Sequence, residues 1–138
     1  MSSLATHTVG LIGLGQIGGS LGLDLTGQRP VRRVIGYDSD ETTLRAAFDR
    51  KAVDSIASHL EDLVEEADLI VVATPIRAAI ELIPRLAEIT KEATVITDVA
   101  GTKAAIVEQV ESNGLGTRYV SAHPMAGSEG TGIRSAQR

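Results

Sequence analysis

The sequence predicts an α/β domain in which a doubly wound, mainly parallel sheet is covered by helices on both faces. Short aliphatic runs alternate along the chain with segments whose apolar residues recur every three or four positions, as strands and helices do in such folds. The aliphatic runs are continuous rather than interleaved with polar residues, which is typical of parallel strands buried on both faces. The chain has 138 residues, so we expect a single domain spanning residues 1–138.

Six runs rich in aliphatic residues predict the strands. They are Thr8–Ile12, Arg33–Tyr37, Val53–Ala57, Leu69–Ala73, Ala93–Thr97 and Tyr119–Ala122. The run Val53–Ala57 is the weakest of them. The acidic run Glu61–Asp68, ahead of the fourth strand, is interpreted as a solvated face.

Four apolar repeats predict helices between these strands. The repeats are Ile17, Leu21 and Leu25; Leu44, Ala47 and Phe48; Ile76, Ile80, Ile83 and Ala87; and Ile106, Val107 and Val110. The three residues of the fourth repeat are expected to face inward. The fourth helix is expected to run from about Thr102 to Ser112 and to end at Asn113-Gly114.

Two prolines bear on the third of these helices. Thr74 is expected to be its N-cap and Pro75 its first helical residue. Pro84 lies inside the repeat, so we expect a kink or a break near Ile80.

Composition excludes several classes of function. A net charge of −5 and only three aromatic residues (Tyr37, Phe48 and Tyr119) argue against nucleic-acid binding. The absence of cysteine removes disulfides, thiolate nucleophiles and cysteine-type zinc sites, and no His, Asp and Glu set has metal-site spacing. No signal peptide and no apolar run of membrane-spanning length is seen, so we expect a cytoplasmic protein that does not enter a membrane.

The run Gly13-Leu14-Gly15-Gln16-Ile17-Gly18 is a G-x-G-x-x-G sequence that follows a predicted strand and opens a predicted helix. In this setting the first glycine permits a tight turn, the second lets the backbone approach a pyrophosphate, and the third lets the helix pack closely on the strand. The helix N-terminus presents N–H groups and a positive dipole to the phosphates. The run therefore predicts a Rossmann-like dinucleotide site, the alternative being a tight turn that binds nothing.

Asp38 lies 20 residues beyond Gly18, at the end of the second predicted strand. Its carboxylate is expected to accept hydrogen bonds from the adenosine ribose and to repel a 2′-phosphate, and neither Ser39 nor Asp40 supplies a cation to offset that charge. We therefore expect the cofactor NAD rather than NADP. The alternative is that Asp38 merely caps the next helix.

Three further segments are expected at the same crevice, because ligands of open α/β sheets bind at the carboxyl ends of the strands. They are residues 73–75, residues 97–103 and the loop that begins at His123. Asp98 is expected to orient a neighbour or cap a helix, and Lys103 to attract a substrate carboxylate. Helix capping and surface solvation are equally good interpretations of both residues.

The loop His123-Pro124-Met125-Ala126-Gly127-Ser128-Glu129-Gly130 combines an imidazole, a hydroxyl, a carboxylate and glycines. The imidazole of His123 is suited to taking a proton near neutral pH, and the backbone at Gly127 is suited to surrounding an anion. Ser128 is expected to donate a hydrogen bond, and Glu129 to orient a partner. The loop predicts a site that binds an anion and moves a proton. A lone histidine is usually structural, but the place of His123 at the end of a strand in a nucleotide-binding fold favours the functional interpretation.

Together these residues resemble the prephenate/arogenate dehydrogenase family of tyrosine biosynthesis. The matching segments are GLIGLGQIGGSL (10–21), GYD (36–38), ADLIVVATP (67–75), TDVAGTK (97–103) and AHPMAGSEGTG (122–132). The first is shared by many dehydrogenases, whereas the last is much more specific. The resemblance implies an NAD(P)-dependent oxidation of a cyclohexadienol, with loss of carbon dioxide and formation of an aromatic ring.

The resemblance also assigns roles to residues. It implies that His123 helps remove the proton of the substrate hydroxyl and that Ser128 contacts the substrate. The family commonly has a serine beside the nicotinamide where this chain has Gly101, next to Thr102. The expected cofactor contacts are Gly13, Gly15, Gln16, Ile17, Gly18, Asp38, Thr74, Pro75 and Asp98. The expected substrate contacts are Gly101, Thr102, Lys103, Gly127, Ser128 and Glu129.

Family enzymes continue into a helical domain that supplies dimer contacts and cationic substrate ligands, so we expect this chain to be the nucleotide-binding part of a homodimeric enzyme. Its small-molecule substrate is expected to be prephenate or arogenate, between which the sequence does not decide. One alternative function is a module that binds NAD without catalysis. Another is an enzyme like the β-hydroxyacid dehydrogenases or imine reductases, which share the glycine turn but carry a different segment in place of HPMAGSEG.

Overall fold

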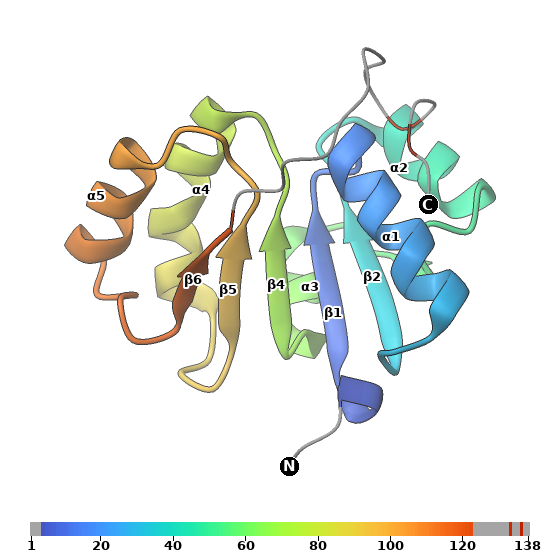
Figure 1. The fold of residues 1–138 in the computed structure, drawn as a ribbon, viewed down its shortest axis with the longest axis horizontal. Helices are drawn as coiled ribbons and strands as arrows, with labels where there is room; N and C mark the ends of the chain where they lie inside the picture. Colours follow the sequence, from blue (N-terminus) through green and yellow to red (C-terminus); the bar gives the residue numbers. More distant parts are fainter. Residues whose placement is uncertain (1–3, 123–132, 134–135, 137–138) are drawn as a thin grey trace.

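The computed structural model describes residues 4–122, 133 and 136, and these form the predicted doubly wound α/β fold (Figure 1). Six parallel strands make one sheet in the order β3-β2-β1-β4-β5-β6. The strands are β1 (Thr8–Ile12), β2 (Arg33–Tyr37), β3 (Ser55–Ile56), β4 (Leu69–Val72), β5 (Val95–Asp98) and β6 (Tyr119–Ser121). The direction of the crossovers reverses between β1 and β4, which creates the switch point where ligands of such sheets bind.

Helices cover both faces of the sheet. They are α1 (Gln16–Gln28), α2 (Glu41–Asp49), α3 (Leu60–Glu66), α4 (Ile76–Ile89) and α5 (Ala104–Ser112), preceded by the 3-10 helix η1 (Leu4–Thr6). Figure 1 shows α1 in front of β1 and β2, and α3 behind the sheet. Because parallel crossovers are right-handed, α1 and α2 lie on one face, and α3, α4 and α5 lie on the other.

Alternate residues of each strand enter two separate apolar cores. In β1, Leu11 packs with the residues of α1 and α2, whereas Ile12 packs with those of α3, α4 and α5. In β4, Val71 belongs to the first core and Val72 to the second. Burial on both faces explains why the strands appear in the sequence as continuous aliphatic runs.

The strand register aligns the carboxyl ends in one row. Ile12 pairs with Tyr37 on one side and with Val72 on the other, while Asp98 pairs with Val72 and Ser121. The residues that follow these ends therefore share one edge of the sheet, where the sequence placed the candidate site.

The strand predictions were confirmed, with small differences in their bounds. β1 and β2 have the predicted bounds, and β4 and β6 are each one residue shorter at the carboxyl end. The weak run 53–57 forms only the two-residue strand Ser55–Ile56. The fifth strand begins at Val95 rather than Ala93 and extends to Asp98, because the buried carboxylate of Asp98 has polar partners that a sequence pattern does not show.

The helix α1 forms as predicted, and Leu21 and Leu25 of the predicted repeat pack against the core. Ile17 is exposed, whereas Gly18, Gly22 and Thr26 are buried. A Cβ on Gly22 would lie 2.3 Å from the carbonyl oxygen of Ala52. The helix thus packs through its glycines, which allow a closer approach than the apolar repeat would permit.

The acidic run contains a helix that the sequence interpretation missed. Leu60, Leu63 and Val64 are buried on one side of α3. The carboxylates of the run are exposed, which confirms the predicted solvated face. The helix was missed because only seven residues carry its apolar pattern and four of them are acidic.

Helices α4 and α5 differ in three details from the predictions. α4 continues from Ile76 to Ile89 without a break at Pro84, because Ile83 and Leu86 on either side are held in the core. Pro75 is the N-cap rather than the first helical residue, since its backbone is extended. In α5, which begins at Ala104, Ile106 and Val110 face inward, but Val107 is exposed.

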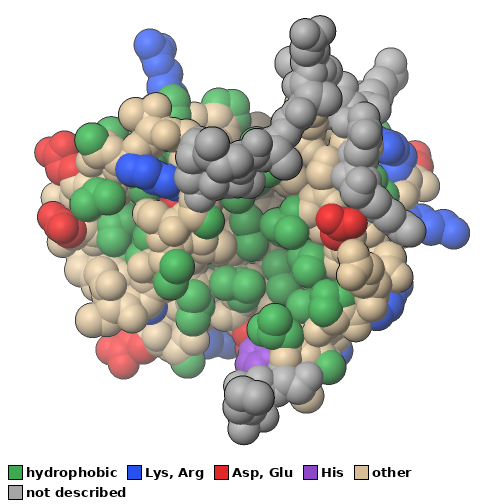
Figure 2. Space-filling model, viewed as in Figure 1, with side chains coloured by type: hydrophobic (Ala, Val, Ile, Leu, Met, Phe, Trp, Pro, Cys, Tyr) green, Lys and Arg blue, Asp and Glu red, His purple; other side chains and the backbone are tan. Residues whose placement is uncertain are grey.

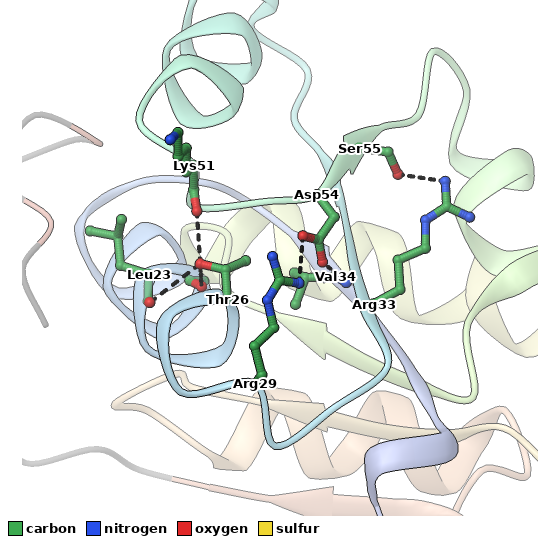
Figure 3. A network of polar contacts seen from close by, with 9 residues as sticks. Leu23, Thr26, Arg29, Arg33, Val34, Lys51, Asp54 and Ser55 are labelled. Atoms are coloured by element: carbon green, nitrogen blue, oxygen red, sulfur yellow. Dashed lines mark hydrogen bonds and ion pairs between the residues drawn. The ribbon is translucent and has the colours of Figure 1, made fainter.

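Polar contacts fix α1 at the edge of the sheet opposite the candidate site (Figure 3). The hydroxyl of Thr26 donates to the carbonyl oxygen of Lys51 at 2.7 Å. Arg29 ends the helix in a left-handed conformation with φ 55°, and its guanidinium pairs with Asp54 at 2.7 Å. The other oxygen of Asp54 accepts the N–H of Val34 at 2.8 Å. The C-terminus of α1 is therefore tied to β2 and to the connection between α2 and β3.

Figure 2 shows hydrophobic side chains gathered over the face of β4 and β5, beside α1. Val95 and Val120 are exposed.

No helix in the described part of the chain is long and apolar enough to cross a membrane.

Candidate functional site: a dinucleotide crevice

The glycine turn joins β1 to α1 at the switch point of the sheet. Gly13 has φ +91°, a conformation that L side chains rarely adopt, and a Cβ there would lie 2.7 Å from the backbone of Ala73. Its N–H donates to the carbonyl oxygen of Tyr37 at 2.9 Å. Both neighbouring strands therefore fix the turn, as the predicted role of Gly13 requires.

The other two glycines also have the geometry that the motif predicts. A Cβ on Gly18 would lie 2.0 Å from the carbonyl oxygen of Gly13, so this glycine lets α1 pack against the turn. Among the described residues, a Cβ on Gly15 would meet no atom within 4 Å. Gly15 is the N-cap of α1 and makes no side-chain capping hydrogen bond, so no side chain of the described residues caps the positive end of this helix.

Asp38 lies at the end of β2, with both carboxylate oxygens on backbone N–H groups. One oxygen accepts from Leu14 in the glycine turn at 2.9 Å, and the other accepts from Asp40 at 2.9 Å. Asp38 does not cap the next helix, because Asp40 is the N-cap of α2 and accepts the N–H of Thr43. The hydrogen bond from the Thr43 hydroxyl also lowers the pKa of Asp40.

A cavity of about 380 Å³ opens between the end of β2 and the start of α4. It is lined by Ile12, Gly13, Gly15, Tyr37, Asp38, Ser39, Thr43, Leu60, Ala73, Thr74, Pro75, Ala78, Leu82 and Arg85. Of the predicted cofactor contacts, Gly13, Gly15, Asp38, Thr74 and Pro75 meet here, whereas Gln16, Ile17, Gly18 and Asp98 do not line the cavity. The order of these groups, from glycine turn to carboxylate to apolar wall, suits the successive parts of a dinucleotide.

Several cavity residues were missed by the sequence interpretation. Leu60, Ala78, Leu82 and Arg85 line the cavity from α3 and α4. Their only sequence signal is that Ala78, Leu82 and Arg85 recur at helical spacing. Thr74 was expected to cap α4, but its hydroxyl oxygen is buried and has no hydrogen-bond partner within the described residues.

At the end of β5, Asp98 and Lys103 form an ion pair. The fully buried carboxylate of Asp98 accepts from Lys103 Nζ at 2.6 Å and from the N–H of Ala100 at 3.0 Å. The ammonium group of Lys103 also donates to the carbonyl oxygen of Ala122, at the end of β6. The side chain of Lys103 is thus held by two groups of this chain. Lys103, rather than Asp98, is the N-cap residue of α5, although its side chain makes no capping hydrogen bond.

Tyr119 lies beside this ion pair. Burial and the negative charge of Asp98 raise the pKa of Tyr119 above its ordinary value. Its hydroxyl oxygen and Asp98 Oδ1 are both buried without a hydrogen-bond partner within residues 4–122. Gly101 and Thr102, two expected substrate contacts, are exposed on the connection between β5 and α5.

The predicted residues His123, Gly127, Ser128 and Glu129 lie outside the described residues. On one side of them, Ala122 is held by Lys103 at the end of β6. On the other side, Arg50 donates to the carbonyl oxygens of Ile133 and Ala136, and the side chains of these two residues pack near Gly19 of α1. Within the described part of the chain, no group of three or more His, Asp or Glu residues could hold a metal ion.

Comparisons with known proteins agree on one family. The model of the prephenate dehydrogenase nucleotide-binding domain matches residues 21–138. A prephenate dehydrogenase of Bacillus subtilis is 35% identical over 133 residues, which are 94% of this chain and 36% of the relative. This chain therefore spans about a third of that relative's length, and the glycine turn is matched by the relatives although it precedes residue 21.

Solved structures give the same result. The crystal structure of Synechocystis arogenate dehydrogenase has a TM-score of 0.84 and 32% identity, covering 94% of this chain and 45% of that one. The structure of prephenate dehydrogenase from Aquifex aeolicus in complex with hydroxyphenyl propionate and NAD⁺ has a TM-score of 0.86 and 28% identity, covering 98% and 47%.

Proposed function

This chain belongs to the prephenate dehydrogenase family, and on that premise we propose that it binds NAD as the nucleotide-binding part of a dehydrogenase that oxidises and decarboxylates prephenate or arogenate. The observation that carries the proposal is the cavity that joins the glycine turn to Asp38 at the switch point of the sheet. The Aquifex aeolicus relative was solved with NAD⁺, which supports the same cofactor.

The residues of the cavity fit the dinucleotide by shape and charge. The open space beside Gly15 leaves room for the pyrophosphate next to the positive end of α1. The carboxylate of Asp38 keeps unshared electron pairs that accept the ribose hydroxyls, while its backbone hydrogen bonds hold it in place. The same charge opposes a ribose 2′-phosphate, so we propose a preference for NAD over NADP.

NAD⁺ supplies a hydride acceptor for the ring carbon that bears the substrate hydroxyl. His123 takes the proton of that hydroxyl as the ring carbon loses its hydride and becomes a carbonyl carbon. The electron pair of the bond to the departing carboxylate then moves through the ring to the carbonyl oxygen as carbon dioxide leaves, and that oxygen takes a proton, which gives an aromatic ring bearing a hydroxyl. Ser128 contacts the substrate in this proposal. Lys103 contributes by holding Ala122, the residue before His123, and its ion pair with Asp98 orients its ammonium group.

A fluorescence titration with NADH and NADPH tests the cofactor proposal. The chain is expected to bind NADH about tenfold or more tightly than NADPH, because bringing a 2′-phosphate to Asp38 costs about 1–4 kcal/mol of charge repulsion. Asp38→Asn should reduce the ratio of NADH affinity to NADPH affinity. Asp49 is exposed on α2, and Asp49→Asn should leave this ratio unchanged. Tighter binding of NADPH by the unchanged chain would refute the preference.

The second candidate is a module that binds NAD without catalysis, and the observation that favours it is Gly101 at the position of the family's serine. Absorbance at 340 nm with NAD⁺ and either prephenate or arogenate separates the two candidates once this chain is joined to a helical domain that carries the family's cationic substrate ligands. Turnover that His123→Asn abolishes while NADH affinity is retained supports the dehydrogenase. NADH binding without turnover of either substrate supports the module.

A further inference from the structure

The cavity continues beyond Asp38 to an apolar wall. Leu60, the first residue of α3, lines this part together with Ala78 and Leu82 of α4. With the pyrophosphate at Gly15 and the ribose at Asp38, the base attached to that ribose extends toward this wall. A flat, apolar surface is what a purine ring requires on the side away from water.

Among the described residues, Arg85 is the only cation that lines the cavity. It follows Leu82 by three positions on α4, so the two side chains lie on the same face of the helix. Its guanidinium donates a hydrogen bond to Glu61, which follows Leu60 on α3. The ion pair therefore connects α3 and α4 at the border of the apolar wall.

The charge state of this pair is fixed at neutral pH. The hydrogen bond from Arg85 holds the pKa of the Glu61 carboxyl below its usual value. Both side chains are about half exposed, so the pair contributes little to the stability of the fold. Arg85 lines the cavity and adds little stability through this pair, so it is a candidate for a role in binding.

We propose that Arg85 is a specificity-determining residue for the adenine base, with its guanidinium packed against the purine ring and oriented by Glu61. The inference rests on the proposed binding of NAD and extends it to a residue that contacts the base. The delocalised guanidinium plane suits an aromatic face, which the point charge of a lysine does not. Because Glu61 already restrains the side chain, binding loses less conformational freedom.

The test compares NADH with reduced nicotinamide mononucleotide, which lacks the adenosine half. Arg85→Ala is expected to weaken NADH binding about two- to fivefold and to leave the mononucleotide unchanged. Glu61→Gln should give a smaller loss of the same kind. Arg85→Lys should not restore NADH affinity, because it keeps the charge but removes the plane. Arg77→Ala is the matched control, since Arg77 is exposed on the same helix and does not line the cavity.

Three outcomes would overturn the inference alone. The first is unchanged NADH affinity in Arg85→Ala, and the second is an equal loss of affinity for both ligands. The third is wild-type NADH affinity in Arg85→Lys, which would show that the positive charge at this position attracts phosphate without contacting the base. A wild-type chain that binds no NADH would instead overturn the proposed function, and this inference with it. Circular dichroism of each variant at the assay temperature checks that it is folded.

Discussion

The two glycines Gly15 and Gly18 separate the stability of the turn from its capacity to bind a dinucleotide. In Gly18→Ala the new Cβ would lie 2.0 Å from the carbonyl oxygen of Gly13, while non-bonded heavy atoms settle at about 3.5 Å. The helix and the turn must therefore move apart by about 1 Å or more. The obstructing atom belongs to the backbone of a residue at φ +91°, so it has no rotamer by which to move away.

The size of the effect follows from two opposing contributions. Overpacking costs about 1–3 kcal/mol and occasionally more, and about 3–4 kcal/mol is expected here because the obstructing atom belongs to the backbone, while alanine regains about 1 kcal/mol of helix propensity. We expect a net loss of about 2–3 kcal/mol for Gly18→Ala. With an unfolding entropy of about 2.1 cal/mol/K per residue, the melting temperature of a chain of this length falls by about 7–10 °C.

Gly15→Ala is the matched comparison. Its Cβ meets no atom of the described residues within 4 Å, and its φ of −73° suits any residue. Loss of a glycine N-cap costs less than about 1 kcal/mol, so the melting temperature should fall by about 3 °C at most. The methyl group enters the space assigned to the pyrophosphate, so the affinity for NADH should fall about tenfold or more.

Thermal unfolding followed at 222 nm and NADH fluorescence together test this separation. The expected pattern is a large loss of stability in Gly18→Ala and a large loss of affinity with little loss of stability in Gly15→Ala. Equal stability of Gly18→Ala and the wild-type chain would refute the packing argument. Unchanged NADH affinity in a folded Gly15→Ala chain would refute the placement of the pyrophosphate.

Two further predictions concern the polar cluster at the end of β5. Lys103→Met should lower the free energy of unfolding by about 3 kcal/mol in urea titrations, because it leaves the Asp98 carboxylate buried without its cation. A loss below about 0.5 kcal/mol would contradict this prediction. The raised pKa of Tyr119 means that the folded chain keeps a proton that the unfolded chain releases above about pH 10, so this tyrosine stabilises the fold fully below pH 10 and progressively less above it. Between about pH 10 and 11, the free energy of unfolding of Tyr119→Phe should therefore decline less steeply than that of the wild-type chain, by up to about 1.4 kcal/mol per pH unit. Tyr37→Phe serves as the control. Equal slopes in Tyr119→Phe and the wild-type chain would count against the assignment.

The sequence was most informative where one local pattern determines the structure. The continuous aliphatic runs at Thr8–Ile12 and Arg33–Tyr37 gave the bounds of β1 and β2, since no competing pattern overlaps them. The spacing of glycines after β1 gave the turn, because backbone geometry at these positions depends on the absence of side chains. The doubly wound order of the sheet then followed from the alternation of strands and helices.

The remaining errors arise where tertiary contacts override a local pattern. The buried side of α1 includes Gly18 and Gly22, and whether a helix packs through glycines depends on how closely its partner approaches. The end of β5 depends on Lys103, whose charge stabilises the buried carboxylate of Asp98 at a position where the sequence predicts a loop. The position of Arg85 at the cavity depends on how α3 and α4 pack together, which no pattern within α4 reveals.

The geometry at Asp38 links the fold to the choice of cofactor. Each of its oxygens accepts one backbone N–H, and one of these comes from Leu14 in the glycine turn. The carboxylate thus positions the turn before any ligand binds, which reduces the reorganisation that binding requires. Asparagine offers only one acceptor oxygen, so Asp38→Asn leaves a backbone N–H without its partner as well as removing the charge. A change of preference toward NADP at this site therefore requires a second substitution that supplies the acceptor again, because the charge that selects NAD also holds the turn in place.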